Sequence, residues 1–205
     1  MPIDVGAGCD IPDSATYSLY QNQELRRGDR TFTVPIEWEE LSGQGFCGSA
    51  HYITKQERVR NPLSGGASIA YQVAPAAWFF APSTETSVSV AVYIPADSYA
   101  EDLNRLRFPQ IPVYGEVEYT VRVRSLTSDT EVRECLSRAI DQSQYQDEFV
   151  DLGTCQVGES ERVEVVLTYL DNLSGRAANN ADGTAALRIV ADAVRFESAT
   201  SAIQE

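Results

Sequence analysis

Residues 87–95 read Ser-Val-Ser-Val-Ala-Val-Tyr-Ile-Pro, a stretch in which valine or isoleucine stands at every second position. Because successive side chains of a β-strand point to opposite faces, this pattern predicts a strand with one face in a core and the other in water. Pro95 has no backbone N–H to donate, so we expect the strand to end there. The stretch indicates an antiparallel sheet that packs on a core with one face.

The same period of two recurs in the rest of the chain. Residues 117–124 alternate apolar with polar and charged side chains, and residues 163–169 repeat the scheme. Residues 187–196 predict one further strand that is apolar enough to be central in a sheet. Weaker candidates are Phe32–Trp38, Ser68–Val73, Ala76–Phe80 and Phe149–Val157.

Turn-forming residues separate these runs. They are Asn61-Pro62, Gly65-Gly66, Pro82-Ser83, Gly158 and residues 179–183. Strands and long helices do not alternate regularly, so the sequence predicts an all-β chain folded as an antiparallel, jelly-roll-like β-sandwich rather than a doubly wound sheet.

Two stretches depart from the strand pattern. Tyr99, Leu103 and Leu106 have helical spacing, so we expect one short helix across an end of the sandwich. Residues 132–140 fit either a helix or a strand, and we favour the strand.

Length and charge restrict the possible partners. A chain of 205 residues with 43% hydrophobic content is long enough for one domain with its own core. Its 16 Lys and Arg stand against 30 Asp and Glu, a net charge of −14, which disfavours nucleic acid and acidic membranes. Neither the apolar run of about 20 residues that crosses a bilayer nor a signal-peptide pattern stands in the sequence as given.

The first 30 residues differ from the rest because they show no sustained alternation. We expect an N-terminal arm over residues 1–30, a sandwich over 31–197 and a C-terminal tail over 198–205. Such an arm is either a disordered leader or a segment that becomes ordered along a neighbouring subunit. Apolar residues such as Tyr17 and Leu19 favour docking, with a homo-oligomer or particle neighbours as partners.

Signatures of catalysis are scarce. His51 is the single histidine, and the chain has neither a G-x-S-x-G elbow nor a phosphate-binding loop. Among 30 acidic residues a carboxylate pair at glycosidase spacing is always imaginable, so it indicates nothing by itself. Without a CxxC pair we expect no zinc and no cofactor, although a structural calcium at an unlocated site is compatible with the sequence. We interpret the chain as not being an enzyme.

Several short motifs follow one another in the order of a known family. They are AWFF at 77–80, VAVYIPA at 90–96, YTV at 119–121, DQS at 141–143, VDLGT at 150–154 and IVADAVRF at 189–196. Over residues 35–197 the chain resembles the golvesin C-terminal-like domain, a β-sandwich related to the carbohydrate-binding domain of xanthan lyases. The resemblance implies a non-catalytic module that binds carbohydrate or cell-envelope glycan.

The last of these motifs places Asp192 on an otherwise apolar strand face. A buried carboxylate without partners costs several kcal/mol or more. We therefore interpret Asp192 as a structural carboxylate that is hydrogen-bonded or lies at the rim.

The four cysteines are an even set, and cysteines 135 and 155 are not fixed features of that family. Two disulfides form if the chain matures outside a reducing cytosol, and four thiols otherwise. If Ala139–Gln142 and Phe149–Val157 pair as a hairpin, Cys135 falls nearly opposite Cys155 and a cross-strand disulfide is geometrically reasonable. Cys9 would then tie the arm to Cys47.

Sugar binding in a sandwich depends on aromatic faces with polar side chains nearby. The candidates in predicted loops are Tyr99, Asn104, Arg105, Tyr114 and Tyr145. The alternative is that Tyr99 and Tyr114 only cover the end of the sandwich. Trp38 and Trp78 are expected in the core.

The leading hypothesis is a carbohydrate or cell-envelope glycan binding module that acts in surface attachment outside the cell. The alternative is a structural subunit of a virion, such as a phage capsid-decoration or tail protein, whose arm docks on neighbouring subunits. An enzyme that uses unassigned carboxylates is a third class.

Overall fold

The computed structural model describes residues 2–3, 15–20, 22–27, 30–35, 38–43, 45–58, 76–96, 113–128, 131–169, 178–179 and 184–198. Within these ranges the chain is built of strands and one short 3-10 helix, η2 (Gln142–Gln144), which confirms the expected all-β antiparallel sandwich. The short helix expected near Tyr99 and the strand expected over Ser68–Val73 lie outside the described residues.

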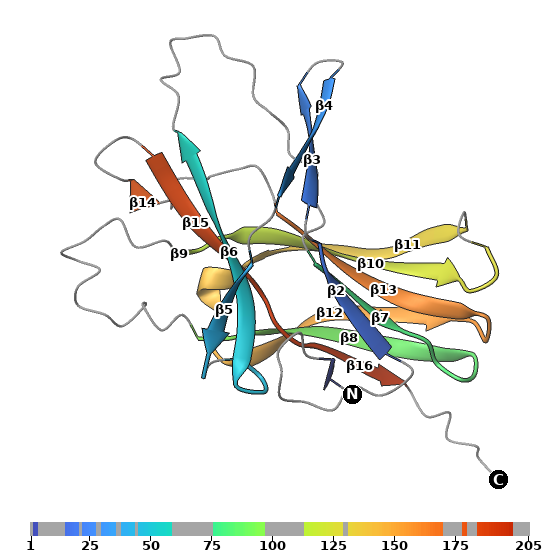
Figure 1. The fold of residues 1–205 in the computed structure, drawn as a ribbon. Coiled ribbons are helices and arrows are strands. Elements are labelled where there is room, and N and C mark those ends of the chain that lie inside the picture. Colours follow the sequence, from blue (N-terminus) through green and yellow to red (C-terminus); the bar gives the residue numbers. More distant parts are fainter. Residues whose placement is uncertain are drawn as a thin grey trace.

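Two sheets pack face to face to form the sandwich (Figure 1). The four-stranded β8 sheet has the order β1 (Pro2–Ile3), β16 (Val194–Ser198), β8 (Thr86–Ile94) and β12 (Glu148–Val157). The five-stranded β10 sheet has the order β11 (Val132–Asp141), β10 (Glu116–Ser125), β13 (Glu161–Tyr169), β7 (Ala76–Phe80) and β2 (Ala15–Leu19).

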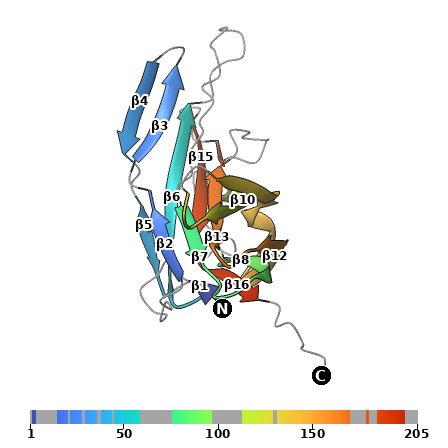
Figure 2. The same ribbon diagram turned by 90° about the vertical axis from the view of Figure 1, so that its right-hand side faces the viewer.

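A third sheet and a hairpin complete the described strands. The β6 sheet has the order β14 (Ala178–Asn179), β15 (Thr184–Ala191), β6 (Ser49–Arg58) and β5 (Glu39–Ser42), with β9 (Val113–Tyr114) parallel to β15. The hairpin joins β3 (Asn22–Arg27) to β4 (Arg30–Pro35), which stands where a strand over Phe32–Trp38 was expected. In both views the hairpin extends away from the sandwich (Figure 2).

The core follows the alternation in the sequence. The inward side chains of β8 and β10 are almost fully buried; they are Val88, Val90, Val92, Ile94, Val117, Tyr119, Val121 and Val123. Trp78 is also in the core, with 1% exposed, and Trp38 packs against the core.

The apolar run from Leu187 to Phe196 is two strands, so the prediction of one strand is wrong. β15 pairs with β6, and β16 pairs with β8 in the other sheet. The break falls at Asp192-Ala193, where the Ala193 carbonyl accepts a 2.8 Å hydrogen bond from the Tyr93 N–H. Residues 188–194 are all buried because the chain passes from one sheet to the other inside the molecule.

The described part of the N-terminal 30 residues pairs with the same chain. β1 pairs with β16 in the β8 sheet, and β2 pairs along its length with β7 in the β10 sheet. Tyr17 and Leu19 of β2 pack against the core. Tyr17 and Leu19, which favoured docking on a neighbouring subunit, therefore pack against the core of their own chain.

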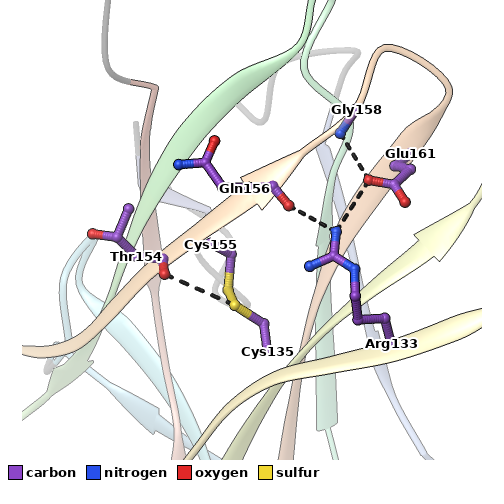
Figure 3. Close-up of polar contacts among 7 residues, drawn as sticks. All are labelled: Arg133, Cys135, Thr154, Cys155, Gln156, Gly158 and Glu161. Carbon is purple, nitrogen blue, oxygen red and sulfur yellow. Dashed lines mark hydrogen bonds and ion pairs between the residues drawn. A yellow bond between two sulfur atoms is a disulfide. The ribbon is translucent and has the colours of Figure 1, made fainter.

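Residues 132–140 form a strand, as favoured, but β11 and β12 do not form a hairpin. β11 pairs with β10 and β12 with β8, so the two strands are edges of different sheets. The disulfide between Cys135 and Cys155 is present and joins these edges, with Cα atoms 6.1 Å apart (Figure 3). Cys47 is also disulfide-bonded, and Cys9, its expected partner, lies outside the described residues.

Polar contacts accompany the disulfide between β11 and β12. The Arg133 guanidinium donates to the Gln156 carbonyl at 2.9 Å and contacts the Glu161 carboxylate at 3.3 Å, while Arg138 donates to the Asp151 carbonyl (Figure 3 shows the first two). The Cys135 sulfur lies 3.8 Å from the Thr154 carbonyl oxygen, a packing contact because a disulfide sulfur carries no proton. The edge between the two sheets is thus closed by side chains.

Candidate functional site

The outer face of the β8 sheet carries the side chains that alternate with the core. Its cross-strand pairs on β12 and β8 are Phe149 with Tyr93, Asp151 with Ala91, Thr154 with Ser89, and Gln156 with Ser87. On the other side of β8, Arg195 pairs with Ala91 and Glu197 with Ser89. The face is therefore aromatic at one end and rich in hydroxyl and amide groups at the other.

Three rings from distant segments meet at the aromatic end. Phe46, Tyr93 and Phe149, which we name the aromatic cluster, contact one another edge to face with centroid distances of 5.1–5.4 Å and interplanar angles of 63–69°. Phe46 is 38% exposed, and the other two rings are half-buried. Edge-to-face packing stabilises aromatic pairs beyond the area that they bury. The cluster is therefore an ordered apolar surface in contact with water.

Phe46 is presented by a tight loop between β5 and β6. The Gly43 N–H donates to the Gly48 carbonyl at 2.6 Å, and the loop glycines 43, 45 and 48 have positive φ angles that other residues rarely adopt. The Phe46 N–H donates to the carboxylate of Asp192 at 3.1 and 3.4 Å. Asp192 is 2% exposed, which confirms its interpretation as a hydrogen-bonded structural carboxylate.

Tyr93 is held by a second carboxylate. Its hydroxyl donates to Asp147 at 3.3 Å, and the same oxygen of Asp147 accepts the Ala96 N–H at 2.8 Å. Asp147 has a φ of 51°, an uncommon backbone conformation outside glycine. Burial raises the pKa of Tyr93 to about 12, and the negative charge of Asp147 adds to the rise. Tyr93 is therefore a neutral hydrogen-bond donor at physiological pH.

Arg195 covers one side of the aromatic cluster. Its guanidinium carbon lies 4.5 Å from the centroid of the Phe149 ring, so the side chain reaches across β8 from β16 to β12. The same guanidinium contacts the Glu197 carboxylate at 3.3 Å. A cation over a ring is attracted by the ring quadrupole, and the ion pair compensates its charge. The cation on this face is thus already neutralised by its neighbours.

The hydroxyl and amide groups at the other end are bonded in pairs. The hydroxyls of Ser89 and Thr154 lie 3.1 Å apart, and the Gln156 side-chain amide donates to the Ser87 hydroxyl at 3.2 Å. Thr154 and Gln156 are exposed. We name these four residues the polar rows.

A buried polar node holds Val190, two residues before Asp192. The side-chain amide of Gln142 donates to the Tyr119 hydroxyl at 3.1 Å and to the Val190 carbonyl at 2.8 Å, and accepts the Val190 N–H at 3.1 Å. Gln142 is fully buried. Burial raises the pKa of Tyr119 well above its usual range. The node fixes the end of β15 just before the Asp192 switch.

The site residues predicted from the sequence are not among the described residues that build this face. Tyr99, Asn104 and Arg105 are outside the described residues. Tyr114 is 2% exposed, with its hydroxyl 3.5 Å from the Ala96 carbonyl, as the alternative of a ring that covers the end of the sandwich would have it. Tyr145 follows η2 and is half-buried against the core. Whether any of them contacts a ligand stays a prediction.

The aromatic cluster was not among the site residues predicted from the sequence. One signal was present, since Tyr93 stands on the outward side of its strand together with Ser87, Ser89 and Ala91. Phe46 gave no periodic signal because it lies in a glycine-rich loop. Its position beside Phe149 depends on contacts between segments about one hundred residues apart in the sequence.

Among the described residues, no group of three or more His, Cys, Asp or Glu is arranged to hold a metal ion. In the same part of the chain no helix is long and apolar enough to span a membrane.

Comparisons with known proteins give only distant likenesses. No family model matches the chain, and no curated protein matches it. A solved structure of the CBM22-1 and GH10 modules of a Clostridium thermocellum endo-1,4-beta-D-xylanase with xylohexaose is similar, with a TM-score of 0.35 and 10% identity over 93% of this chain and 30% of that one. A Podospora anserina GH26-CBM35 beta-(1,4)-mannanase is similar with a TM-score of 0.32 and 10% identity, over 94% of this chain and 29% of that one. A xylan-binding module CBM15 has a TM-score of 0.30 and 14% identity, over 73% of this chain and 99% of that one.

The chain therefore spans less than a third of the first two proteins. All three structures include carbohydrate-binding modules by name. At these scores we draw no conclusion about function from them.

Proposed function

We propose that this chain is a non-catalytic β-sandwich module that binds carbohydrate on the outer face of its β8 sheet. The observation that carries the proposal is the display of the Phe46 ring on Tyr93 and Phe149, at the end of a face otherwise made mainly of hydroxyl, amide and charged groups. Pyranose rings pack their C–H surfaces on aromatic rings, and their hydroxyls need polar partners nearby. This face offers both.

Preorganisation supports binding over mere packing of a loop. Phe46 is fixed through its own backbone by Asp192, and Tyr93 through its hydroxyl by Asp147. A ligand that meets such rings loses little free energy in ordering them. The Tyr93 hydroxyl and the Asp147 carboxylate also lie at the edge of the cluster, where sugar hydroxyls would reach them.

Two further observations support an attachment role outside the cell. The Cys135–Cys155 disulfide is typical of proteins that mature in an oxidising compartment. The segments 90–96 and 189–196, which resemble the golvesin C-terminal-like domain, supply Tyr93, Asp192 and Arg195 to this site. We therefore extend the proposal to a golvesin-like module that attaches to cell-envelope glycan.

The virion alternative receives less support. It depends on an N-terminal arm that grips a neighbouring subunit, whereas β1 and β2 hydrogen-bond with β16 and β7 of this chain. No contact among the described residues favours it, so we give precedence to glycan binding.

The proposal is tested by replacing the exposed ring. Phe46→Ala should lower the affinity for a glycan identified on an array by about tenfold, because the stacking surface is lost. Phe79→Ala is the matched control, since Phe79 is a half-buried ring under the Arg162 guanidinium on the outer face of the other sheet. Affinity is measured by titration calorimetry, and folding of both variants by circular dichroism. Equal affinity of Phe46→Ala and wild type, or an array without any bound glycan, would contradict the proposal.

A further inference from the structure

The polar rows extend the aromatic cluster along β8, and this continuity bears on the shape of the ligand. Tyr93, Ser89 and Ser87 lie on one side of the same strand, and β12 supplies a partner beside each of them. From Tyr93 to Ser87 is six residues, about 20 Å at the rise of a β-strand. That distance is several times the width of one sugar ring.

The paired groups in the rows keep hydrogen-bonding capacity for a ligand. A hydroxyl that bonds another hydroxyl uses one O–H and one lone pair, so the Ser89–Thr154 pair retains one O–H and several lone pairs. The Gln156 amide has a second N–H and its carbonyl oxygen beyond the bond to Ser87. Each row therefore offers donors and acceptors together, which suits sugar hydroxyls that act as both.

The charges on this face favour an uncharged ligand. Among the described residues, the strands of the β8 sheet place one cation on this face, Arg195, which lies over Phe149 and is paired with Glu197, while Asp151 is exposed on β12. Arg133 and Arg138 reach the edge of β12 from β11, where both bond backbone carbonyls and Arg133 is paired with Glu161. The whole chain has a net charge of −14. An acidic polysaccharide would meet exposed carboxylates and a cation that is already compensated, which costs affinity.

Resting on the proposed carbohydrate binding, we infer that the outer face of the β8 sheet binds one extended, uncharged oligosaccharide. Its chain runs along β8, with one sugar on the aromatic cluster and the following sugars hydrogen-bonded to the Ser89–Thr154 row and then the Ser87–Gln156 row. The aromatic cluster would stack on one sugar ring, and the polar rows would make the affinity rise with the length of the oligosaccharide.

The test uses neutral β-1,4-linked gluco-, xylo- and manno-oligosaccharides from disaccharide to hexasaccharide, measured by titration calorimetry. Affinity of wild type should rise with chain length and then level off. The double variant Ser89→Ala with Thr154→Val should lose about two- to tenfold in affinity for the longer oligosaccharides, the loss expected for one or two hydrogen bonds, and nothing for the disaccharide.

The matched control removes a hydroxyl pair elsewhere. Ser125 and Thr127 lie 3.0 Å apart at the end of β10, so Ser125→Ala with Thr127→Val removes the same groups away from the face. This control should bind every oligosaccharide as wild type does. Because all four residues lie at the surface or half-buried, equal melting temperatures are expected and show that any loss is local.

The outcomes separate this inference from the proposed function. If a disaccharide and a hexasaccharide bind equally, or the row variant binds long chains as wild type does, the extended site is refuted while carbohydrate binding stands. If an acidic chain such as polygalacturonate binds more tightly than the neutral series, the charge argument is refuted. If none of the neutral chains binds while the array yields a bound glycan, this inference alone is refuted. If no glycan binds in either experiment, the proposed function fails as well.

Discussion

Truncation of Gln142 should destabilise the fold more than any change at a neighbouring surface glutamine. The side chain is fully buried and satisfies both the N–H and the carbonyl of Val190, a residue that is itself 1% exposed. The Gln142 side chain therefore makes the two backbone hydrogen bonds that a neighbouring strand would make to Val190 of β15. Gln142→Ala leaves both backbone groups without this partner.

The size of the effect follows from those contacts. Each orphaned buried donor or acceptor costs about 1–3 kcal/mol, and the Tyr119 hydroxyl loses a donor as well. Water that enters the space left by the side chain recovers part of this cost. We expect the free energy of unfolding to fall by about 3–4 kcal/mol, a large share of the about 5–15 kcal/mol typical of a domain.

The assay is equilibrium urea unfolding followed by tryptophan fluorescence, since Trp78 lies in the core. Gln144→Ala is the matched control because Gln144 is exposed two residues away on the same 3-10 helix, and its loss should stay within about 0.5 kcal/mol. If the two variants lose similar amounts, the node does not support β15 and the reasoning is refuted.

Two further predictions concern β12 and the aromatic cluster. Gly153→Ala should lower the free energy of unfolding by about 2–3 kcal/mol in the same urea assay, because φ is 128° and a Cβ would lie 2.9 Å from a Leu136 methyl; a comparable loss in Gly158→Ala, which has no positive φ, would contradict this. The raised pKa of Tyr93 predicts stability that is complete below pH 10 and is lost as pH rises through about 12, because the folded state holds a proton that the unfolded chain releases near pH 10. In a tyrosinate absorbance titration, Tyr93→Phe should therefore lose one tyrosine's share of the absorbance that develops above pH 10, while the step of buried Tyr119 remains, and identical titrations would rule the assignment out.

The period of two in the sequence was sufficient to predict a β-sandwich, but not to predict which sheet each strand joins. It located β8, β10 and β13 because one face of each packs in the core, while most of the alternate residues on the other face are polar or charged. It did not reveal that the chain changes sheets at Asp192-Ala193, because a strand that is apolar on both faces gives the same pattern as two strands that meet inside the core. Sheet membership is set by contacts between distant residues, which no local pattern contains.

The same reason explains the two errors of pairing. β2 has only five residues, so the alternation of Ala15, Tyr17 and Leu19 with Thr16 and Ser18 was too short to predict a strand that pairs with β7. Cys135 and Cys155 were brought together correctly as candidates, but through a hairpin that does not exist. The two cysteines are only 20 residues apart in the sequence, which suggested neighbouring strands of one sheet. The disulfide instead joins the edge strands of two different sheets.

Asp192 connects the stability of the fold with the display of the site. The free-energy cost of burying its carboxylate is partly offset by the hydrogen bond from the Phe46 N–H. The residue at the break between β15 and β16 therefore also holds the loop that carries the exposed ring. A loop that packed for stability alone would gain from burying Phe46, yet that ring keeps 38% of its surface in water. Asp192 thus holds the backbone of the loop while the ring of Phe46 stays partly exposed, and a ligand that stacks on it would lose little free energy in ordering that backbone.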